Sequence, residues 1–144
     1  MNRYLGDDWA LPQLDPNTRP FFTSGEISIQ MCDSCGTPQH PPDDVCHACQ
    51  GMAFNFRESA GLGTVHSYIV VHHAIHPALV DRVPYAVALI SLDDMPNVRV
   101  CGNILDLAPG EVSIGLRVRV VFEEVHDAEF DEQLTIPQWE LLKI

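Results

Sequence analysis

The sequence predicts a mostly β protein in which a helical lead-in precedes a metal-binding ribbon and a small five-stranded barrel. Three observations predict this architecture. Two Cys-x-x-Cys pairs lie ten residues apart, apolar and polar residues alternate in short runs from residue 54 onward, and Gly, Pro or Asp turn signals separate those runs. We expect residues 1–25 to form the lead-in, residues 26–53 the ribbon and residues 54–144 the barrel.

The lead-in contains one helix signal and three aromatic residues. Asp15-Pro16 offers a helix N-cap followed by proline at the first helical position, which predicts a helix beginning there. Trp9, Phe21 and Phe22 lie in a segment with little core of its own. Two interpretations of these aromatics stay open. They either staple the lead-in to the barrel, or they dock on another protein, where aromatic side chains commonly act as anchors.

The ribbon is defined by four cysteines, which follow a short alternating strand over residues 27–31. Two Cys-x-x-Cys pairs supply four thiolates, which suits a tetrahedral Zn²⁺ ion and leaves no ligand position open. Such a closed site stabilises a fold but cannot bind and activate a water molecule. We therefore expect a structural metal, with Zn²⁺ preferred over iron. The predicted ligands are Cys32, Cys35, Cys46 and Cys49.

The remainder of the chain shows five strand patterns separated by turns. The runs cover residues 64–71, 85–92, 98–104, 116–123 and 134–144. The second run is apolar on both faces, which predicts a central strand. Pro137 lies inside the last run and favours an edge strand or a bulge. Five short strands of this kind predict an OB-fold, with a β-sandwich as the alternative.

The composition excludes several classes of function. The formal net charge is −12, from 8 basic and 20 acidic residues, and no Lys or Arg lies between the first and last ribbon cysteines. Proteins that bind nucleic acid normally present a basic face to the phosphates, so we expect no nucleic-acid partner. No apolar run approaches the roughly 20 residues that span a bilayer, and the first residues lack a signal-peptide pattern. Because cysteines in metal spacing fit a reducing compartment, we expect a cytoplasmic protein without a membrane span.

Several short motifs, taken together and in order, resemble one known family. The matching stretches are Thr18-Arg19-Pro20-Phe21-Phe22, Cys32-x-x-Cys35-Gly36, Pro41-Pro42, Cys46-x-x-Cys49, Gly61-Leu62-Gly63-Thr64-Val65, Pro84-Tyr85-Ala86-Val87-Ala88 and Gly102-Asn103. They cover nearly the whole chain. The sequence thereby resembles the acyl-CoA-associated proteins that join an N-terminal rubredoxin-like zinc ribbon to a C-terminal OB-fold, first catalogued as domain-of-unknown-function family thirty-five.

This resemblance implies an accessory role. Members of the family look like subunits that sit beside thiolase-fold enzymes: thiolases, hydroxymethylglutaryl-CoA synthase pairs, and aldolases that cleave side chains from steroid-CoA thioesters. Some are fused or paired with MaoC-type enoyl-CoA hydratases. The resemblance therefore implies a hetero-oligomer in which the partner carries the catalytic residues and the CoA thioester is shared. One position departs from the family, because Asp43 follows the proline pair where an arginine is common.

Other side chains suggest an alternative function as a stand-alone acyl-CoA binder. Arg57, Arg82 and Arg99 could form a basic mouth on the barrel for CoA phosphates. His72 and His73 follow the first barrel strand at a loop that OB-folds often use for binding, so they are candidate contacts to CoA or to a partner. Because adjacent strand residues point to opposite faces, we do not expect these two histidines to share a metal ion.

We predict no catalytic residue in this chain. Cys101 lies in an apolar strand pattern, where a free cysteine is usually a small buried hydrophobe, and no local group activates it. We expect Arg117 and Arg119 to pair with acidic neighbours such as Glu123 or Glu124. The acidic run over residues 123–132 predicts a solvated loop. The leading hypothesis is a zinc-stabilised subunit of a thiolase or aldolase that acts on CoA thioesters.

Overall fold

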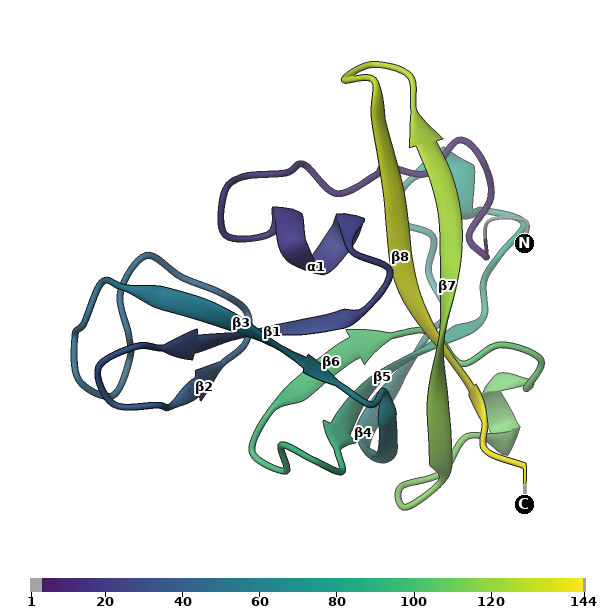
Figure 1. Ribbon diagram of the computed structural model, residues 1–144. Helices are drawn as coiled ribbons and strands as arrows, with labels where there is room; N and C mark the ends of the chain where they lie inside the picture. Colours follow the sequence, from purple (N-terminus) through teal and green to yellow (C-terminus); the bar gives the residue numbers. More distant parts are fainter. Residues whose placement is uncertain (1–3, 144) are drawn as a thin grey trace.

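The computed structural model describes residues 4–143 and divides their strands between two sheets (Figure 1). The smaller sheet has the strand order β2-β1-β3 and projects from the rest of the molecule. The larger sheet has the order β6-β5-β4-β7-β8. The elements are α1 (Arg19–Thr23), β1 (Ile27–Cys32), β2 (Pro38–Gln39), β3 (Phe54–Ser59), β4 (Leu62–Val71), η1 (Pro77–Leu79), β5 (Tyr85–Leu92), β6 (Arg99–Gly102), η2 (Pro109–Glu111), β7 (Arg117–Asp127) and β8 (Glu132–Leu141).

The larger sheet is the expected five-stranded OB-fold. Strand β5 pairs with both β4 and β6, so the prediction of a central strand is confirmed. Strand β8 pairs with β7 and has no second strand beside it, which places Pro137 on an edge strand as expected. The open side of β8 meets the chain after β6 through one parallel bridge between Ile104 and Trp139. The sheet edges therefore approach each other without forming a second full ladder.

The core of the molecule lies inside this sheet and extends to the small one. Ile90, Val118 and Trp139 are fully buried in the same cluster as Ile27 and Ile29, which come from β1. Strand β1 therefore contributes to both sheets' packing. In the same core, a Cβ atom at position 102 would approach Trp139 Cδ1 to 2.7 Å, so the close packing of this indole requires glycine there.

The lead-in helix begins later than the sequence predicts. Helix α1 starts at Arg19, with Thr18 at the N-cap and Pro20 in the first turn. The Asp15 carboxylate instead accepts hydrogen bonds from the backbone N–H groups of Asn17 and Thr18, both at 2.8 Å. The predicted start at Asp15-Pro16 is thus wrong, because Asp15 caps a turn that precedes the helix.

The acidic run over residues 123–132 is a solvated loop only at residues 128–131, which form an exposed turn. Strand β7 continues to Asp127 and β8 begins at Glu132, so most of the run lies in a long hairpin. Glu123 is only 2% exposed. The charge pattern fails here because pairing with the neutral residues of β8 buries one side of the hairpin, which the local sequence does not reveal.

The strand arginines form surface ion pairs, but with other partners than we expected. Arg117 Nη1 and Nη2 donate to the two carboxylate oxygens of Asp93, each at 2.6 Å. Arg119 pairs with Glu140 on the neighbouring strand β8. The prediction that both arginines form solvated ion pairs is confirmed. Their partners, however, lie on other strands or loops of the sheet and are not Glu123 or Glu124.

The chain passes from the smaller sheet to the larger one after Ser59. Residues 54–59, which the sequence analysis assigns to the start of the barrel, form β3 and pair with β1 along the whole of β1. Gly61 and the strand β4 then begin the larger sheet. The proposed three units, with boundaries at residues 25 and 53, stay a prediction. Among residues 4–143, no helix is long and apolar enough to span a membrane.

Candidate functional site

The four ribbon cysteines converge on one point. Their Sγ atoms all lie within 4.8 Å of one another, with 3.5 Å between Cys32 and Cys49 and 3.7 Å between Cys35 and Cys46. These distances exclude disulfide bonds, which need about 2.05 Å. A tetrahedron with Zn–S bonds of about 2.3 Å has sulfur–sulfur edges of about 3.8 Å. The sulfur positions therefore fit a single tetrahedral zinc ion.

Two similar turns carry the four sulfurs. In the first, the Gly36 N–H donates to the Cys32 carbonyl at 2.9 Å, and in the second the Gln50 N–H donates to the Cys46 carbonyl at 3.0 Å. Gly36 and Gln50 both have positive φ angles, +72° and 62°. Glycine adopts a positive φ angle freely, which explains why Gly36 follows the first cysteine pair. Gln50 is one of three non-glycine residues in the described chain with a positive φ angle.

The space beside the sulfurs is tight at position 51. A Cβ atom on Gly51 would lie 3.3 Å from both Cys32 Sγ and Cys49 Sγ and 3.2 Å from Ser34 Oγ. Gly51 also accepts a hydrogen bond from the Cys46 N–H at 2.8 Å. The backbone thus closes tightly around the thiolates, as a structural metal site requires. We conclude that the four cysteines form the structural zinc site of the ribbon.

A buried amide network supports this site. Gln30 accepts hydrogen bonds from Gln39 Nε2 at 2.9 Å and from the Asp43 N–H at 3.0 Å, and its own Nε2 donates to the Asp43 carbonyl at 2.8 Å. Gln39 accepts from the His47 N–H at 2.8 Å. Both glutamines are buried. The sequence analysis missed them, although Gln30 and Gln39, polar residues in the short strands that flank the first cysteine pair, offered a weak signal.

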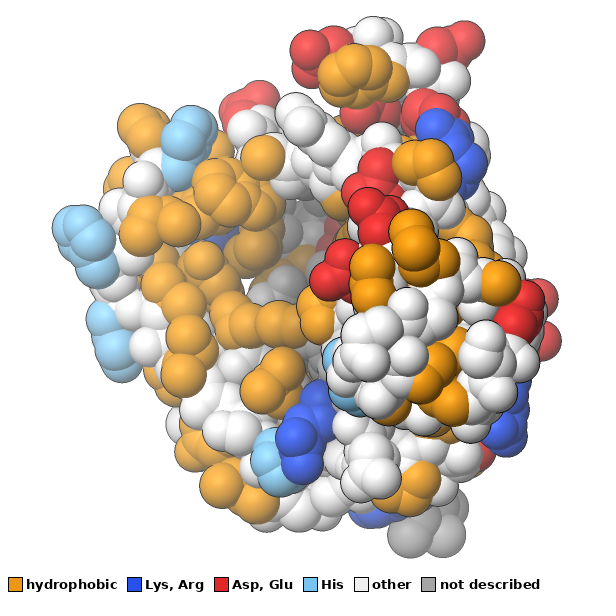
Figure 2. Space-filling model, turned by 90° about the vertical axis from the view of Figure 1, so that its left-hand side faces the viewer, with side chains coloured by type: hydrophobic (Ala, Val, Ile, Leu, Met, Phe, Trp, Pro, Cys, Tyr) orange, Lys and Arg blue, Asp and Glu red, His pale blue; other side chains and the backbone are white. Residues whose placement is uncertain are grey.

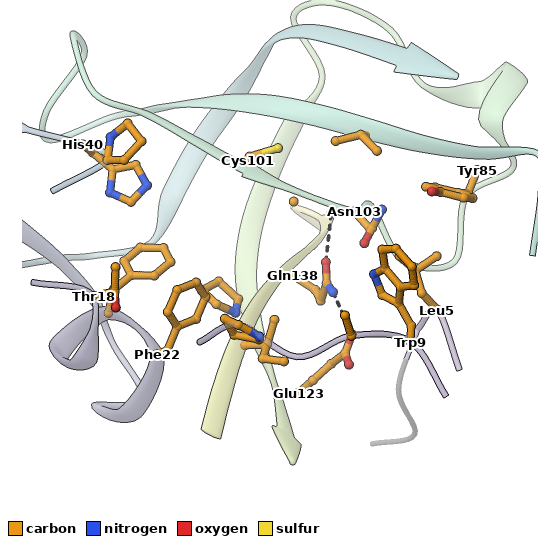
Figure 3. A pocket seen from close by; sticks show the side chains of 18 of the residues that line it. Leu5, Trp9, Thr18, Phe22, His40, Tyr85, Cys101, Asn103, Glu123 and Gln138 are labelled. Atoms are coloured by element: carbon orange, nitrogen blue, oxygen red, sulfur yellow. Dashed lines mark hydrogen bonds between the residues drawn. The ribbon is translucent and has the colours of Figure 1, made fainter. Parts of the chain in front are cut away.

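A second candidate site is a pocket of about 480 Å³ where the lead-in, the ribbon loop and the barrel meet. Figure 2 shows a hollow on the ribbon-bearing face with hydrophobic side chains gathered around it, and Figure 3 shows the pocket from close by. Most of its described lining is apolar. The lining residues are Leu5, Trp9, Ala10, Pro12, Thr18, Phe21, Phe22, His40, Pro41, Pro42, Tyr85, Val87, Cys101, Gly102, Asn103, Glu123, Ile136, Pro137 and Gln138.

A chain of polar groups lies at one side of this pocket (Figure 3). Gln138 accepts a hydrogen bond from the Asn103 N–H at 2.8 Å, and its Nε2 donates to Glu123 Oε1 at 2.7 Å. The Tyr4 N–H donates to the same carboxylate oxygen at 3.2 Å. The lead-in thus reaches across the barrel to Glu123, which ends the strand pattern expected over residues 116–123 and begins the acidic run that was expected to be a loop.

Cys101 lies in the wall of the pocket, which corrects our expectation that it is buried. It is exposed on β6, opposite Leu89 of β5. Partial burial raises the pKa of its thiol. Burial also lowers the pKa of His40 to about 4, so this imidazole is neutral at pH 7 and has no positive charge to stabilise a thiolate. Among the described residues, no hydrogen bond joins the Cys101 thiol to a base.

The structure does not bring the candidate cationic residues into this pocket. Arg57 is exposed in the small sheet, Arg82 lies between η1 and β5, and Arg99 is exposed at the start of β6. None of them belongs to the described lining. His72 and His73 are exposed directly after β4. The expected basic mouth is therefore absent from the lining that the structure describes.

The three aromatic residues of the lead-in have different surroundings. Phe21 is 5% exposed and belongs to the main core cluster, which is the stapling role. Phe22 packs partly against that core, and its ring meets Phe21 edge-on at 5.0 Å between centroids. Trp9 lies over the pocket and contacts the His76 ring at 5.5 Å. Trp9 and Phe22 retain surface that a partner could contact.

Comparison with known proteins identifies the family. Residues 23–54 match the family profile described as the rubredoxin-like zinc ribbon domain of ChsH2, and residues 56–123 match its C-terminal OB-fold domain. A DUF35 domain-containing scaffold protein of Methanocaldococcus jannaschii is 32% identical over 105 residues, which is 72% of each chain. The chain belongs to the DUF35 family. The resemblance and the fold predicted from the sequence are thus confirmed.

Two further relatives of this DUF35 protein are parts of larger enzymes by name. A solved structure titled Ltp2-ChsH2(DUF35) aldolase contains a chain with 34% identity and a TM-score of 0.74, and the match covers 91% of this chain and 98% of that one. A probable enoyl-CoA hydratase alpha subunit of Thermomonospora curvata is 38% identical over 111 residues. That match covers 77% of this chain and 32% of the hydratase subunit, so the chain spans about a third of that relative's length.

Proposed function

We propose that this DUF35 chain is a non-catalytic accessory subunit that completes a thiolase-fold enzyme acting on CoA thioesters, either a thiolase or a side-chain-cleaving aldolase. One observation carries the proposal most. The match covers 91% of this chain and 98% of a chain in the solved structure titled Ltp2-ChsH2(DUF35) aldolase, at 34% identity, so the two share their fold over most of their length. A DUF35 scaffold protein of similar length is a second relative.

The chemistry of the two candidate sites supports an accessory role. The zinc site offers four thiolates and no open position for a water molecule. The pocket contains a thiol with a raised pKa, and no hydrogen-bonded nucleophile–base pair lies among its described residues. An acyl-transfer enzyme needs such a pair, or a metal-bound water, to activate its nucleophile. The partner subunit would therefore supply the reacting groups.

The charge of the chain bears on where CoA binds. CoA carries several phosphate charges, and a chain with a net charge of −12 repels it at long range. In a shared site the partner would supply most of the positive charge. From this chain, exposed Arg57, Arg82 and Arg99 would be the contacts to phosphate, with His72 and His73 as contacts to CoA or the partner. We place the complex in the cytoplasm.

The proposal is tested by purifying the tagged chain from its own cells and identifying co-purifying subunits by native mass spectrometry. We expect a hetero-oligomer with a thiolase-fold protein. Replacing Trp9, a half-buried residue of the lead-in, by Ala should weaken that complex. Replacing the exposed, apolar Met52 of the ribbon by Ala serves as the control. Isolation of the chain only as a homomeric species would contradict the proposal.

A second candidate partner is an enoyl-CoA hydratase of the MaoC type. The 38% identity to a hydratase alpha subunit favours it, since that relative contains a region similar to this chain that makes up 32% of its length. The same native mass spectrometry distinguishes the two, because the mass and peptide sequences of the partner identify its fold class. Hydration of an enoyl-CoA thioester by the isolated complex would establish this alternative.

A further inference from the structure

The pocket between the lead-in and the barrel has the size and lining of a small-molecule site. Its volume of about 480 Å³ lies within the range of roughly 300–1,000 Å³ that is usual for ligand pockets. Its walls come from four parts of the chain: the lead-in, helix α1, the loop between the cysteine pairs, and strands of the barrel. Most of the lining side chains are apolar, and the few polar ones converge at Gln138 (Figure 3).

Glu123 is the acidic side chain in the described lining of this pocket, and it has capacity for further hydrogen bonds. Only its Oε1 atom accepts hydrogen bonds from the described chain, from Gln138 Nε2 and the Tyr4 N–H. Glu123 is buried, with 2% of the residue exposed. A carboxylate offers about four acceptor positions, so Glu123 can accept a further hydrogen bond from a ligand that enters the pocket.

The charge of the pocket selects the ligand's head group. No Lys or Arg lies among its described lining residues, and the only imidazole there, His40, is neutral at pH 7 because burial lowers its pKa to about 4. A carboxylate or phosphate brought beside an ionised Glu123 would therefore meet like charge, and no cation of the described lining would compensate it. A hydroxyl, an amide N–H or an ammonium group would instead donate to the carboxylate.

We propose that this pocket binds an apolar small molecule through a hydrogen-bond-donating head group, which Glu123 accepts beside the Gln138 amide. The apolar body of the ligand lies against Phe22, Val87 and Ile136, under the lead-in residues Leu5 and Trp9. The site is distinct from the zinc centre, and its acidic lining disfavours an anionic head group. The proposal does not rest on the enzyme partner, because all of its groups belong to this chain.

Three probes with the same eight-carbon chain separate the possible head groups: octan-1-ol, octylammonium and octanoate. Binding to the zinc-loaded chain is followed by ¹H–¹⁵N NMR through the side-chain amides of Gln138 and Asn103. We expect octan-1-ol, octylammonium or both to shift these signals and to bind about tenfold more tightly than octanoate, as a charge-assisted hydrogen bond implies. The proposal is overturned if octanoate binds equally well or if none of the probes shifts the two amides.

Two matched variants assign the effect to Glu123. Glu123→Gln keeps the shape and an acceptor for Gln138 while removing the charge, so the preference over octanoate should fall about tenfold. Glu124→Gln makes the same change at the next, exposed residue of β7 and should leave the preference intact. If Glu123→Gln does not fold, Cys101→Phe fills the pocket from an exposed position on β6 and should abolish probe binding. Unchanged binding in the variant that folds would sink the proposal.

Discussion

The ribbon and the barrel obtain their structure from different interactions. In the ribbon's outer strand β3, only Ser59 is buried, and Phe56 is 38% exposed. In the barrel, Ile90, Val118 and Trp139 have no exposed surface. The barrel is held by apolar burial, whereas the ribbon has little core of its own and is held by four thiolates and a buried amide network. A small sheet without a core commonly needs a metal to remain folded.

The two regions meet in strand β1. Its first half places Ile27 and Ile29 in the barrel core, and its last residue, Cys32, is a zinc ligand. The junction is strengthened by hydrogen bonds from the lead-in, between Asn17 and Asp44 at 2.6 Å and between Arg19 and Glu132 at 2.6 Å. Loss of metal should therefore destabilise the ribbon beyond Cys32 most and the barrel least. Four predictions test this difference, from the largest expected effect to the smallest.

The largest effect is expected from loss of a zinc ligand. Cys46→Ser should release the metal and unfold the ribbon, because structural zinc contributes on the order of 10 kcal/mol to folding. Metal analysis and hydrogen exchange measure the two consequences. Amides of β2 and of residues 40–51 should lose protection, whereas β5 and β7 should keep theirs. Cys101→Ser is the control and should retain one zinc per chain. Equal loss of protection in both regions would refute the separation described above.

A core substitution should show the opposite pattern. Ile90→Ala removes a fully buried side chain from β5 and should lower the free energy of unfolding by about 2–5 kcal/mol, with zinc content unchanged. Leu89→Ala on the same strand removes a side chain that is 40% exposed and should cost much less. Urea unfolding with parallel zinc analysis tests both variants. Zinc loss in Ile90→Ala at native conditions would mean that the barrel core, rather than the thiolates, holds the ribbon.

Acid should act on the junction through His40. Burial lowers the pKa of this histidine from 6.5 to about 4. The unfolded chain binds the proton below pH 6.5 while the folded chain does not, so stability is lost as the pH falls from 6.5 toward 4. Between pH 7 and pH 5, the wild type should lose up to about 2 kcal/mol more than His40→Phe, which retains the ring against Phe21. If the urea midpoints of the two proteins fell by the same amount between pH 7 and pH 5, His40 would not be the cause of the acid sensitivity.

The smallest effect is expected at the glycine beside the sulfurs. Gly51→Ala places a methyl group 3.3 Å from two of the zinc ligands and should weaken zinc binding about tenfold, as changes beside metal ligands commonly do. Gly110→Ala is a matched control, because nothing lies within 4 Å of the added carbon. Competition with a chromogenic chelator measures both affinities. An unchanged affinity in Gly51→Ala would show that the ribbon adjusts more easily than its packing suggests.

The sequence predicted the features that local patterns encode. Cysteine spacing determines the zinc site, and a continuous apolar run over residues 85–92 predicted the limits of β5 as the structure has them. Features that depend on distant pairing were missed. Glu123 is buried beneath Gln138 of the neighbouring strand β8 and the lead-in residue Tyr4. Cys101 is exposed because its side of β6 faces a pocket, while Val100 on the other side lies in the core. The alternation in β4 also fails after Val65, where a bulge shifts its register with β5.

The central claim is that this chain acts only as part of a larger enzyme, and one assay tests it most directly. The purified chain and the complex isolated from cells are each supplied with CoA thioesters, and cleavage or formation of the carbon–carbon bond is followed by mass spectrometry. We predict turnover by the complex, loss of turnover when the DUF35 chain is removed, and none by the chain alone. Turnover of a CoA thioester by the solitary, zinc-loaded chain would contradict the account.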